Sequence, residues 1–147
     1  RAKEMGMTVD EVVTLASIVE REAANDADRD KVASVFINRL NSTEYPYLQS
    51  CATVQYVLKE RKPVLSIADT KIDSPYNTYK YKGLPVGPIA SPGKASIEAV
   101  LWPADTDYYF FVLGSDGQHI FSKTLAEHNK AIKDANADTS FGTGTVK

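Results

Sequence analysis

Apolar side chains in the first forty residues repeat with the period of a helix. The first stripe comprises Val9, Val12, Val13, Leu15, Ala16, Ile18, Val19 and Ala23, at steps of three and four residues. Thr8 and Glu11 have the spacing of a capping box, which satisfies free amides where a helix begins. A second apolar stripe follows the polar turn at 25–28. The pattern therefore predicts a largely buried helix from Val9 to Ala24 and a second one ending near Asn41, packed as an antiparallel-like pair.

The second half of the chain mixes helical and strand patterns. Ser91-Pro92 resembles the start of a helix that stops before Pro103. Tyr108–Leu113 is rich in strand-forming residues and is followed, after a glycine turn, by a hairpin partner at His119–Phe121. A last helix is predicted from Thr124 to about Ala135. Since repeated βαβ units are missing, we expect an α+β fold with a buried helical pair, a small antiparallel sheet and long ordered loops.

Between Asn41 and Ala90 the periodicity is weak and aromatic residues are frequent. Only a short helix at Thr53–Glu60 and a helical turn at Ser66–Asp69 are expected there. The tyrosines of this section are Tyr45, Tyr47, Tyr56, Tyr76, Tyr79 and Tyr81, with glycines and prolines between them. Aromatic faces and hydroxyls suit the binding of sugar rings or peptides, although the packing of a loop core explains such a cluster equally well.

Composition limits the classes of function. The chain has 147 residues, 43% of them hydrophobic, which fits one globular domain. Its 17 basic and 19 acidic side chains form no basic stripe, so nucleic acid is not expected as a partner. The single cysteine, two separated histidines and missing phosphate-binding glycine loop predict no metal and no cofactor. No stretch reaches the ~20 apolar residues of a membrane span.

Glu22 is a candidate catalytic acid because of its position on the first helix. At 100° per residue it lies near 220° from Val9, between Ile18 and Leu15 and inside the apolar arc, by a rough ideal-helix estimate. Glu20 lies on the other flank. Apolar surroundings disfavour a charged carboxylate, so Glu22 would keep a transferable proton near neutral pH. The alternative is a frayed last turn in which Glu22 pairs with Arg21, Arg29 or Lys31.

Six segments of the chain occur in the order and spacing of a known enzyme family. They are ASIVEREA (16–23), DRDKVASVFINRL (28–40), LQSCATVQY (48–56), SPYNTYKYKGLPVGPIASPG (74–93), YYFFV (108–112) and HIFSKTLAEHN (119–129). Over nearly its whole length the chain is similar to the endolytic murein transglycosylases, the YceG-like family. The resemblance implies a lyase that cleaves peptidoglycan glycan strands between N-acetylmuramic acid and N-acetylglucosamine and forms a 1,6-anhydromuramyl end.

The resemblance also implies roles for particular residues. Glu22 matches the second glutamate of the family's ASI-[VI]-E-x-E motif, its catalytic acid, which then acts as base toward the sugar's own C6 hydroxyl. We expect the glycan to be positioned by residues that supply donors, acceptors, flat faces or close backbone approach. These substrate-binding residues are Tyr76, Asn77, Tyr79, Gly83, Leu84, Pro85 and Gly87.

The family pattern sets expectations for the rest of the protein. Residues 1–136 are expected to form the catalytic domain and 137–147 a flexible tail. The family usually has an N-terminal membrane helix and a LysM-like subdomain before this region, so the parent protein is expected at the outer face of the cytoplasmic membrane, near the cell-wall synthesis machinery. Two departures stand out: Cys51-Ala52 replaces the commoner Asp-Pro, and Val86 replaces a commoner Pro.

Two other functions fit the same residues. In a conventional glycan hydrolase, Glu22 would work with a second acid such as Asp73 or Asp107. In a non-catalytic module that binds the cell wall, Tyr76 and its neighbours would hold glycan, and Glu22 would be dispensable.

Overall fold

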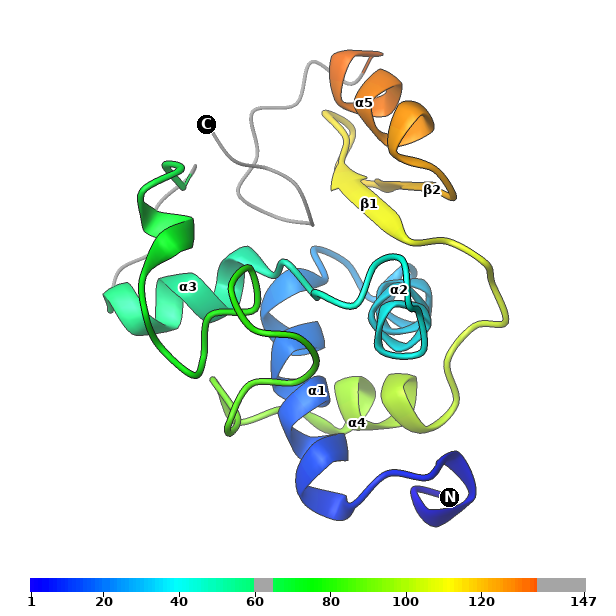
Figure 1. The fold of residues 1–147 in the computed structure, drawn as a ribbon. Coiled ribbons are helices and arrows are strands. Elements are labelled where there is room, and N and C mark those ends of the chain that lie inside the picture. Colours follow the sequence, from blue (N-terminus) through cyan, green and yellow to red (C-terminus); the bar gives the residue numbers. More distant parts are fainter. Residues whose placement is uncertain (60–64, 135–147) are drawn as a thin grey trace.

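The structure, a computed structural model, describes residues 1–59 and 65–134 (Figure 1). A short 3-10 turn, η1 (Lys3–Met5), precedes the long helices, and a second one, η2 (Asp69–Lys71), lies in the middle of the chain. The helices are α1 (Val9–Glu22), α2 (Arg29–Leu40), α3 (Cys51–Leu58), α4 (Lys94–Leu101) and α5 (Leu125–Asp134). The strands are β1 (Phe110–Leu113) and β2 (His119–Ser122). The prediction of an α+β fold is confirmed.

The core lies where α1, α2 and α4 meet beneath the hairpin. Its fully buried side chains include Leu15, Ile18, Val19, Val32, Val35, Phe36, Val100 and Phe111. Helix α1 lies in the plane of Figure 1 while α2 is seen nearly end-on, so the two helices cross steeply. The predicted antiparallel-like arrangement is wrong. The turn between the helices is tied to the hairpin by Asp28, whose Oδ2 accepts from the His119 amide at 3.0 Å.

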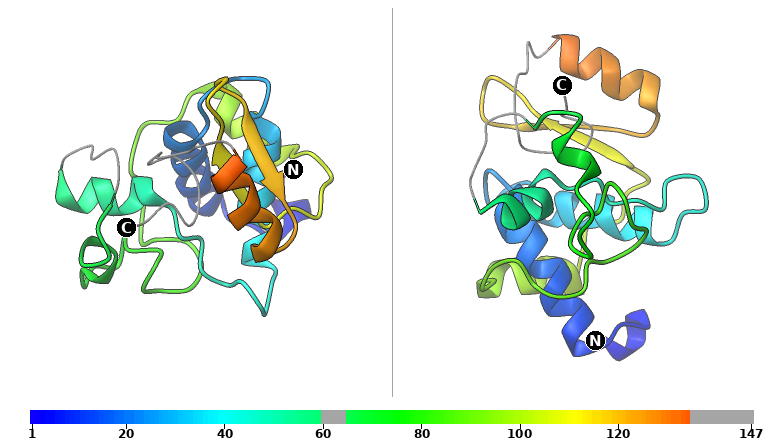
Figure 2. Two further views of the ribbon diagram at one scale, coloured as in Figure 1. Left: turned by 90° about the horizontal axis from the view of Figure 1, so that it is seen from above. Right: turned by 60° about the vertical axis from the view of Figure 1, so that its left-hand side comes forward.

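The two strands form an antiparallel hairpin that is covered by α5 (Figure 2). Phe110 pairs with Ser122 and Leu113 with His119. Phe111 points into the helical layer, where its ring meets that of Phe36 edge-on at 5.7 Å. The hairpin prediction is confirmed, although the first strand begins at Phe110 rather than Tyr108.

Several predicted helix boundaries differ from the structure. Helix α4 begins at Lys94 with Gly93 as its N-cap, because the Gly93 amide finds its acceptor in Glu20 Oε1 at 2.8 Å, so Ser91 is not the cap. Val9 is 72% exposed rather than buried, at the first turn of α1. The Thr8 capping box is present, with Glu11 N to Thr8 Oγ1 at 3.1 Å and Thr8 N to Glu11 Oε1 at 2.9 Å.

The remaining boundaries shift by a few residues. The first helix ends at Glu22 instead of Ala24, and the second at Leu40. The short helix predicted at 53–60 is α3 at 51–58, and the turn predicted at 66–69 is η2 at 69–71. The predicted ends at Glu60 and Ala135, and the predicted tail 137–147, lie outside the described residues.

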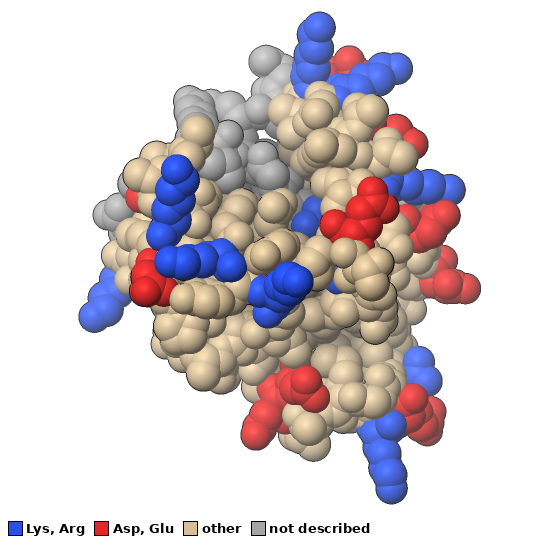
Figure 3. Space-filling model, viewed as in Figure 1, with Lys and Arg blue, Asp and Glu red and all other residues tan. Residues whose placement is uncertain are grey.

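Charge and hydropathy add little to this picture. In the described part of the chain, no helix is both long and apolar enough to cross a membrane. On the face shown in Figure 3, basic and acidic side chains of the described residues are interspersed, without one continuous basic stripe.

Candidate active site

Glu22, the last residue of α1, is a buried carboxyl group whose donors among the described residues include a hydroxyl and a backbone amide. Only 1% of the residue is exposed. Its Oε1 accepts from Ser50 Oγ at 3.0 Å and from the Ala52 backbone amide at 3.0 Å. That amide lies in the first turn of α3, where backbone N–H groups have no partner within the helix. The buried position predicted by the helical wheel is confirmed.

Glu20 faces the opposite side of the same helix. Its Oε1 accepts from the Gly93 amide at 2.8 Å and from Ser96 Oγ at 3.1 Å, and its Oε2 lies 3.7 Å from Arg29. The pKa of Glu20 is lowered, chiefly by the Gly93 hydrogen bond and with smaller contributions from Ser96 and Arg29. Arg29 also pairs with Asp26 at 2.6 Å. Glu20 therefore connects α1 to the start of α4.

A buried network of hydroxyl groups holds Ser50 beside Glu22. The Ser50 amide donates to Thr78 Oγ1 at 2.9 Å, and Thr53 Oγ1 donates to the Ser50 carbonyl at 2.8 Å. The Thr53 and Thr78 hydroxyls lie 2.9 Å apart. Each of these residues is at most 1% exposed. Sequence reasoning missed them, because Ser and Thr at separations of 25 to 28 residues give no periodic signal.

The departure at Cys51-Ala52 falls within this site. Cys51 Sγ lies 3.1 Å from the hydroxyl of Tyr79. Burial, and then the charge of Glu22, raises the pKa of the Cys51 thiol to about 12. Burial also raises the pKa of Tyr79 well above its ordinary value. Both groups are therefore neutral at neutral pH, and Ala52 supplies an amide that a proline could not.

The YNTY segment reaches the site through Thr78 and Tyr79. Asn77 is 1% exposed and holds its own loop: its Nδ2 donates to the carbonyls of Thr70 at 2.9 Å and Ile72 at 2.8 Å, and its Oδ1 accepts from the Tyr79 amide at 3.0 Å. Tyr76 is partly buried, with its ring 4.8 Å from that of Tyr56 on α3.

The GLP loop is anchored to α1, the helix that ends in Glu22. Gly83 has a φ of +76°, which favours glycine, and its amide donates to the Pro46 carbonyl at 3.1 Å. Leu84 packs against the main core and Pro85 is buried. A side chain on Gly87 would meet the Tyr76 hydroxyl at 3.4 Å. After the loop, the Ile89 amide donates to Ser17 Oγ at 3.0 Å.

Asp73 and Asp107, the candidate second acids of a hydrolase, are exposed and paired with neighbouring side chains. Asp73 accepts from the Tyr81 hydroxyl at 2.6 Å and lies 3.5 Å from Lys80. Asp107 lies 3.2 Å from Lys123. Across residues 1–59 and 65–134, no group of three His, Cys, Asp or Glu side chains is arranged to hold a metal ion.

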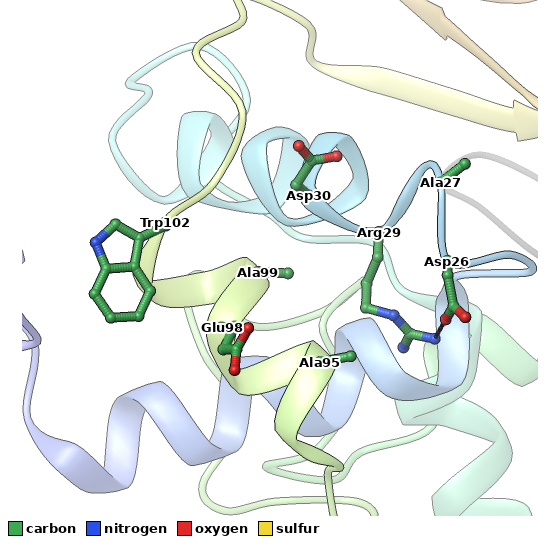
Figure 4. Close-up of a pocket in the computed structure, with 8 residues that line it drawn as sticks. All are labelled: Asp26, Ala27, Arg29, Asp30, Ala95, Glu98, Ala99 and Trp102. Carbon is green, nitrogen blue, oxygen red and sulfur yellow. Dashed lines mark hydrogen bonds and ion pairs between the residues drawn. The ribbon is translucent and has the colours of Figure 1, made fainter.

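A separate hollow of about 370 Å³ lies between the start of α2 and α4 (Figure 4). It is lined by Asp26, Ala27, Arg29, Asp30, Ala95, Glu98, Ala99 and Trp102. In Figure 4, Arg29 turns toward Asp26 across the turn that joins α1 to α2, while Trp102 lies at the far end of α4. These residues belong to the side of α1 that Glu20 faces, not to the surroundings of Glu22.

Together, the fold and site define a class of small α+β domain in which the last residue of a core helix is a buried glutamate that lies at the N-terminus of a second helix. The model of the YceG-like family matches residues 1–134, and the chain belongs to this family.

Two named relatives and one solved structure extend this result. The chain is 49% identical over 129 residues to an endolytic murein transglycosylase of Bacillus subtilis (strain 168), covering 88% of this chain and 35% of that protein. It is 37% identical over 136 residues to an endolytic murein transglycosylase of Streptococcus pneumoniae serotype 2 (strain D39 / NCTC 7466), covering 88% of this chain and 24% of that protein. A crystal structure of a yceG-like protein from Listeria monocytogenes matches with a TM-score of 0.80 and 45% identity, over 88% of this chain and 42% of that one. The chain thus spans about a third or less of the length of these two named relatives.

Proposed function

We propose that this chain carries the catalytic site of an endolytic peptidoglycan lytic transglycosylase. The observation that carries the proposal is Glu22, 1% exposed at the end of α1, with a hydroxyl and an amide directed at one of its oxygens. Family membership and the names of the two relatives support peptidoglycan as the substrate.

The proposed reaction needs one carboxyl group. Protonated Glu22 donates its proton to the glycosidic oxygen between N-acetylmuramic acid and N-acetylglucosamine, and the bond from that oxygen to the anomeric carbon breaks. The resulting carboxylate takes the proton of the C6 hydroxyl on the same sugar, whose oxygen closes onto the anomeric carbon as a 1,6-anhydro ring. No water is consumed, and Glu22 ends protonated. At 1% exposure, Glu22 meets a glycan only after the groups that cover it shift.

The loop residues are proposed to position the glycan. Tyr76, Tyr79 and the backbone from Gly83 to Gly87 offer rings, hydroxyls and close backbone approach. The three hydrogen bonds of the Asn77 carboxamide support an indirect role in which it shapes the loop. The anchoring of the GLP loop on α1, and of Thr78 beside Ser50, supports a groove that includes Glu22.

The decisive experiment is mass analysis of muropeptides after digestion with the wild-type full-length gene product and its Glu22→Gln variant. Gln keeps the shape of the side chain but cannot donate the proton, so anhydro-product formation should fall by about three orders of magnitude or more. Glu20→Gln is the matched control, because it makes the same change two residues away and should retain most activity.

Other outcomes would favour the alternatives. Reducing-end products, heavier by one water, would indicate a two-carboxylate hydrolase. Glycan binding that survives in Glu22→Gln, with no cleavage by the wild type, would indicate a binding module. Activity lost on chelation and restored by metal would also contradict the proposed mechanism, which uses no cofactor.

The cellular setting is part of the same proposal. We infer that the protein works at the outer face of the cytoplasmic membrane, held by a membrane anchor elsewhere in the parent protein and near the cell-wall synthesis machinery. Newly made glycan strands are available at this face. Fractionation of cells that produce the tagged full-length gene product tests the location.

A further inference from the structure

The two donors to Glu22 differ in kind but share one acceptor atom. Ser50 Oγ and the Ala52 amide both lie 3.0 Å from Oε1. Hydrogen bonds of this type favour the charged form of a carboxyl group, whereas burial favours the protonated form. Both bonds therefore favour the carboxylate, against the effect of burial. The groups around Glu22 thus bear on the pH at which its proton leaves.

We propose that Ser50 and the backbone amide of Ala52 are positioning groups that orient Glu22 and set the pH range in which it works as an acid. This inference rests on the proposed function and deepens the same site. Neither group needs to touch the glycan, because both act through the Glu22 carboxyl group.

Both donors are held by structure outside Glu22. The backbone of Ser50 is fixed by its bonds to Thr78 and Thr53, at 2.9 and 2.8 Å. The Ala52 amide takes its direction from α3. A buried carboxyl group between such donors is confined to one orientation, which favours proton transfer to a bound substrate.

The titratable neighbours of Glu22 among the described residues keep one charge state from neutral pH to about pH 9. Cys51 and Tyr79 face Glu22 and are both neutral at neutral pH, since burial raises the pKa of each. Arg39 acts on Tyr79 and keeps its charge, with a pKa lowered to about 10 by burial. His119 accepts from the Ala24 amide beyond the end of α1, and its lowered pKa makes it neutral on the alkaline side. Among the described residues, Glu22 is therefore the group whose titration we assign to the alkaline limb of the activity profile below about pH 9.

The first test removes the hydroxyl of Ser50 in the full-length gene product. Ser50→Ala should lower kcat about tenfold or more at the pH optimum, leave KM within about twofold, and move the alkaline limb upward by about one pH unit. The limb moves upward because the lost donor had favoured the carboxylate. Ser50→Thr keeps a hydroxyl and should restore part of kcat and the wild-type limb.

Ser96→Ala is the matched control for this change. It removes an equally buried hydroxyl that donates to Glu20 on the other side of α1. It should lower stability without moving the alkaline limb. The inference would be overturned if the alkaline limb of the activity profile stayed at the wild-type pH in Ser50→Ala. It would also be overturned if the limb moved equally in Ser96→Ala.

The second test removes the Ala52 amide. Ala52→Pro deletes the N–H in the first turn of α3, where proline is tolerated and no intrahelical bond is lost. Its pH profile should shift in the same direction as that of Ser50→Ala. Ala52→Gly keeps the amide and should show the wild-type limb. Circular dichroism establishes whether each variant folds. If Ala52→Pro does not fold, the comparison of Ser50→Ala with Ser50→Thr decides the inference.

A direct titration separates this inference from the proposed function. The Glu22 carboxyl carbon is followed by NMR in the wild type and in Ser50→Ala, assigned with Glu22→Gln. A higher titration midpoint in Ser50→Ala supports the positioning role even if no anhydro product forms, an outcome that would defeat the proposed function alone. Equal midpoints would defeat the positioning role alone.

Discussion

Replacing Glu20 should cost stability while leaving the chemistry of Glu22 in place. In Glu20→Ala, the Gly93 amide at 2.8 Å and the Ser96 hydroxyl at 3.1 Å lose their common acceptor, and Arg29 loses a charge 3.7 Å away. Gly93 is the N-cap residue of α4, so its bond to Glu20 resembles the bond of a capping box in which a carboxylate accepts from the N-cap amide.

The magnitude follows from how exposed these groups are. Gly93 is exposed and its amide turns to water, and Ser96 remains bonded to Arg29 at 2.7 Å, so no donor is left isolated in the core. The Glu20 side chain is 33% exposed, which weakens its ion pair. We therefore expect a loss of about 1–2 kcal/mol in the free energy of unfolding, or about 3–8 °C in Tm.

The loss should depend on pH with a definite sign. The pKa of Glu20 is lower in the folded protein than its ordinary value, chiefly because of the Gly93 amide. Its contribution to stability is therefore present above the ordinary pKa and disappears as the pH falls through the folded value. Urea denaturation of the wild type and Glu20→Ala, from neutral pH to about pH 3, should show curves that converge in acid.

Glu20→Gln separates the effect of the lost charge from that of the lost acceptor. Glu20→Gln keeps an acceptor oxygen without charge and should lose less stability than Glu20→Ala. If the folded Glu20→Gln protein lost anhydro-product formation as completely as Glu22→Gln, Glu20 would belong to the chemistry. If the stability gap stayed constant down to about pH 3, the ionised carboxylate would not be its source.

Two further predictions concern groups near the site. The Cys51 thiol, with a pKa of about 12 in its buried position, should react with iodoacetamide at neutral pH many times more slowly in the native protein than in urea, as measured by mass spectrometry. His119 has a pKa lowered by burial, so the unfolded chain takes up its proton first and stability should decline as the pH falls below about 6.5; His119→Gln should flatten this decline in a series of thermal melts.

The sequence was informative where local patterns decide the structure. The capping box at Thr8 and the apolar steps after it predict α1 and the buried side of Glu22. The hairpin is equally local, because strand-forming residues flank a glycine turn at Gly117, whose φ is +81°. Such features depend on neighbours in the sequence, which a single chain displays.

Contacts between distant segments could not be predicted in this way. Ser50, Thr53 and Thr78 look like ordinary polar residues until folding buries them. The start of α4 differs from the prediction for a related reason, since the acceptor of the Gly93 amide is Glu20, 73 residues away in the sequence. The apolar stripe predicts that Val9 is buried, but at the first turn of α1 it is 72% exposed.

The spacing of the two glutamates explains how one helix end serves both fold and site. Residues two apart on a helix lie about 200° from each other, so Glu20 and Glu22 point to opposite sides of α1. Each meets a helix N-terminus, Glu20 that of α4 and Glu22 that of α3. Glu20 is partly exposed and ion-paired, which suits a permanent carboxylate, whereas Glu22 is buried beside the neutral groups Cys51 and Tyr79. The two glutamates therefore have different surroundings, and only the buried position suits the acid and base role that is proposed for Glu22.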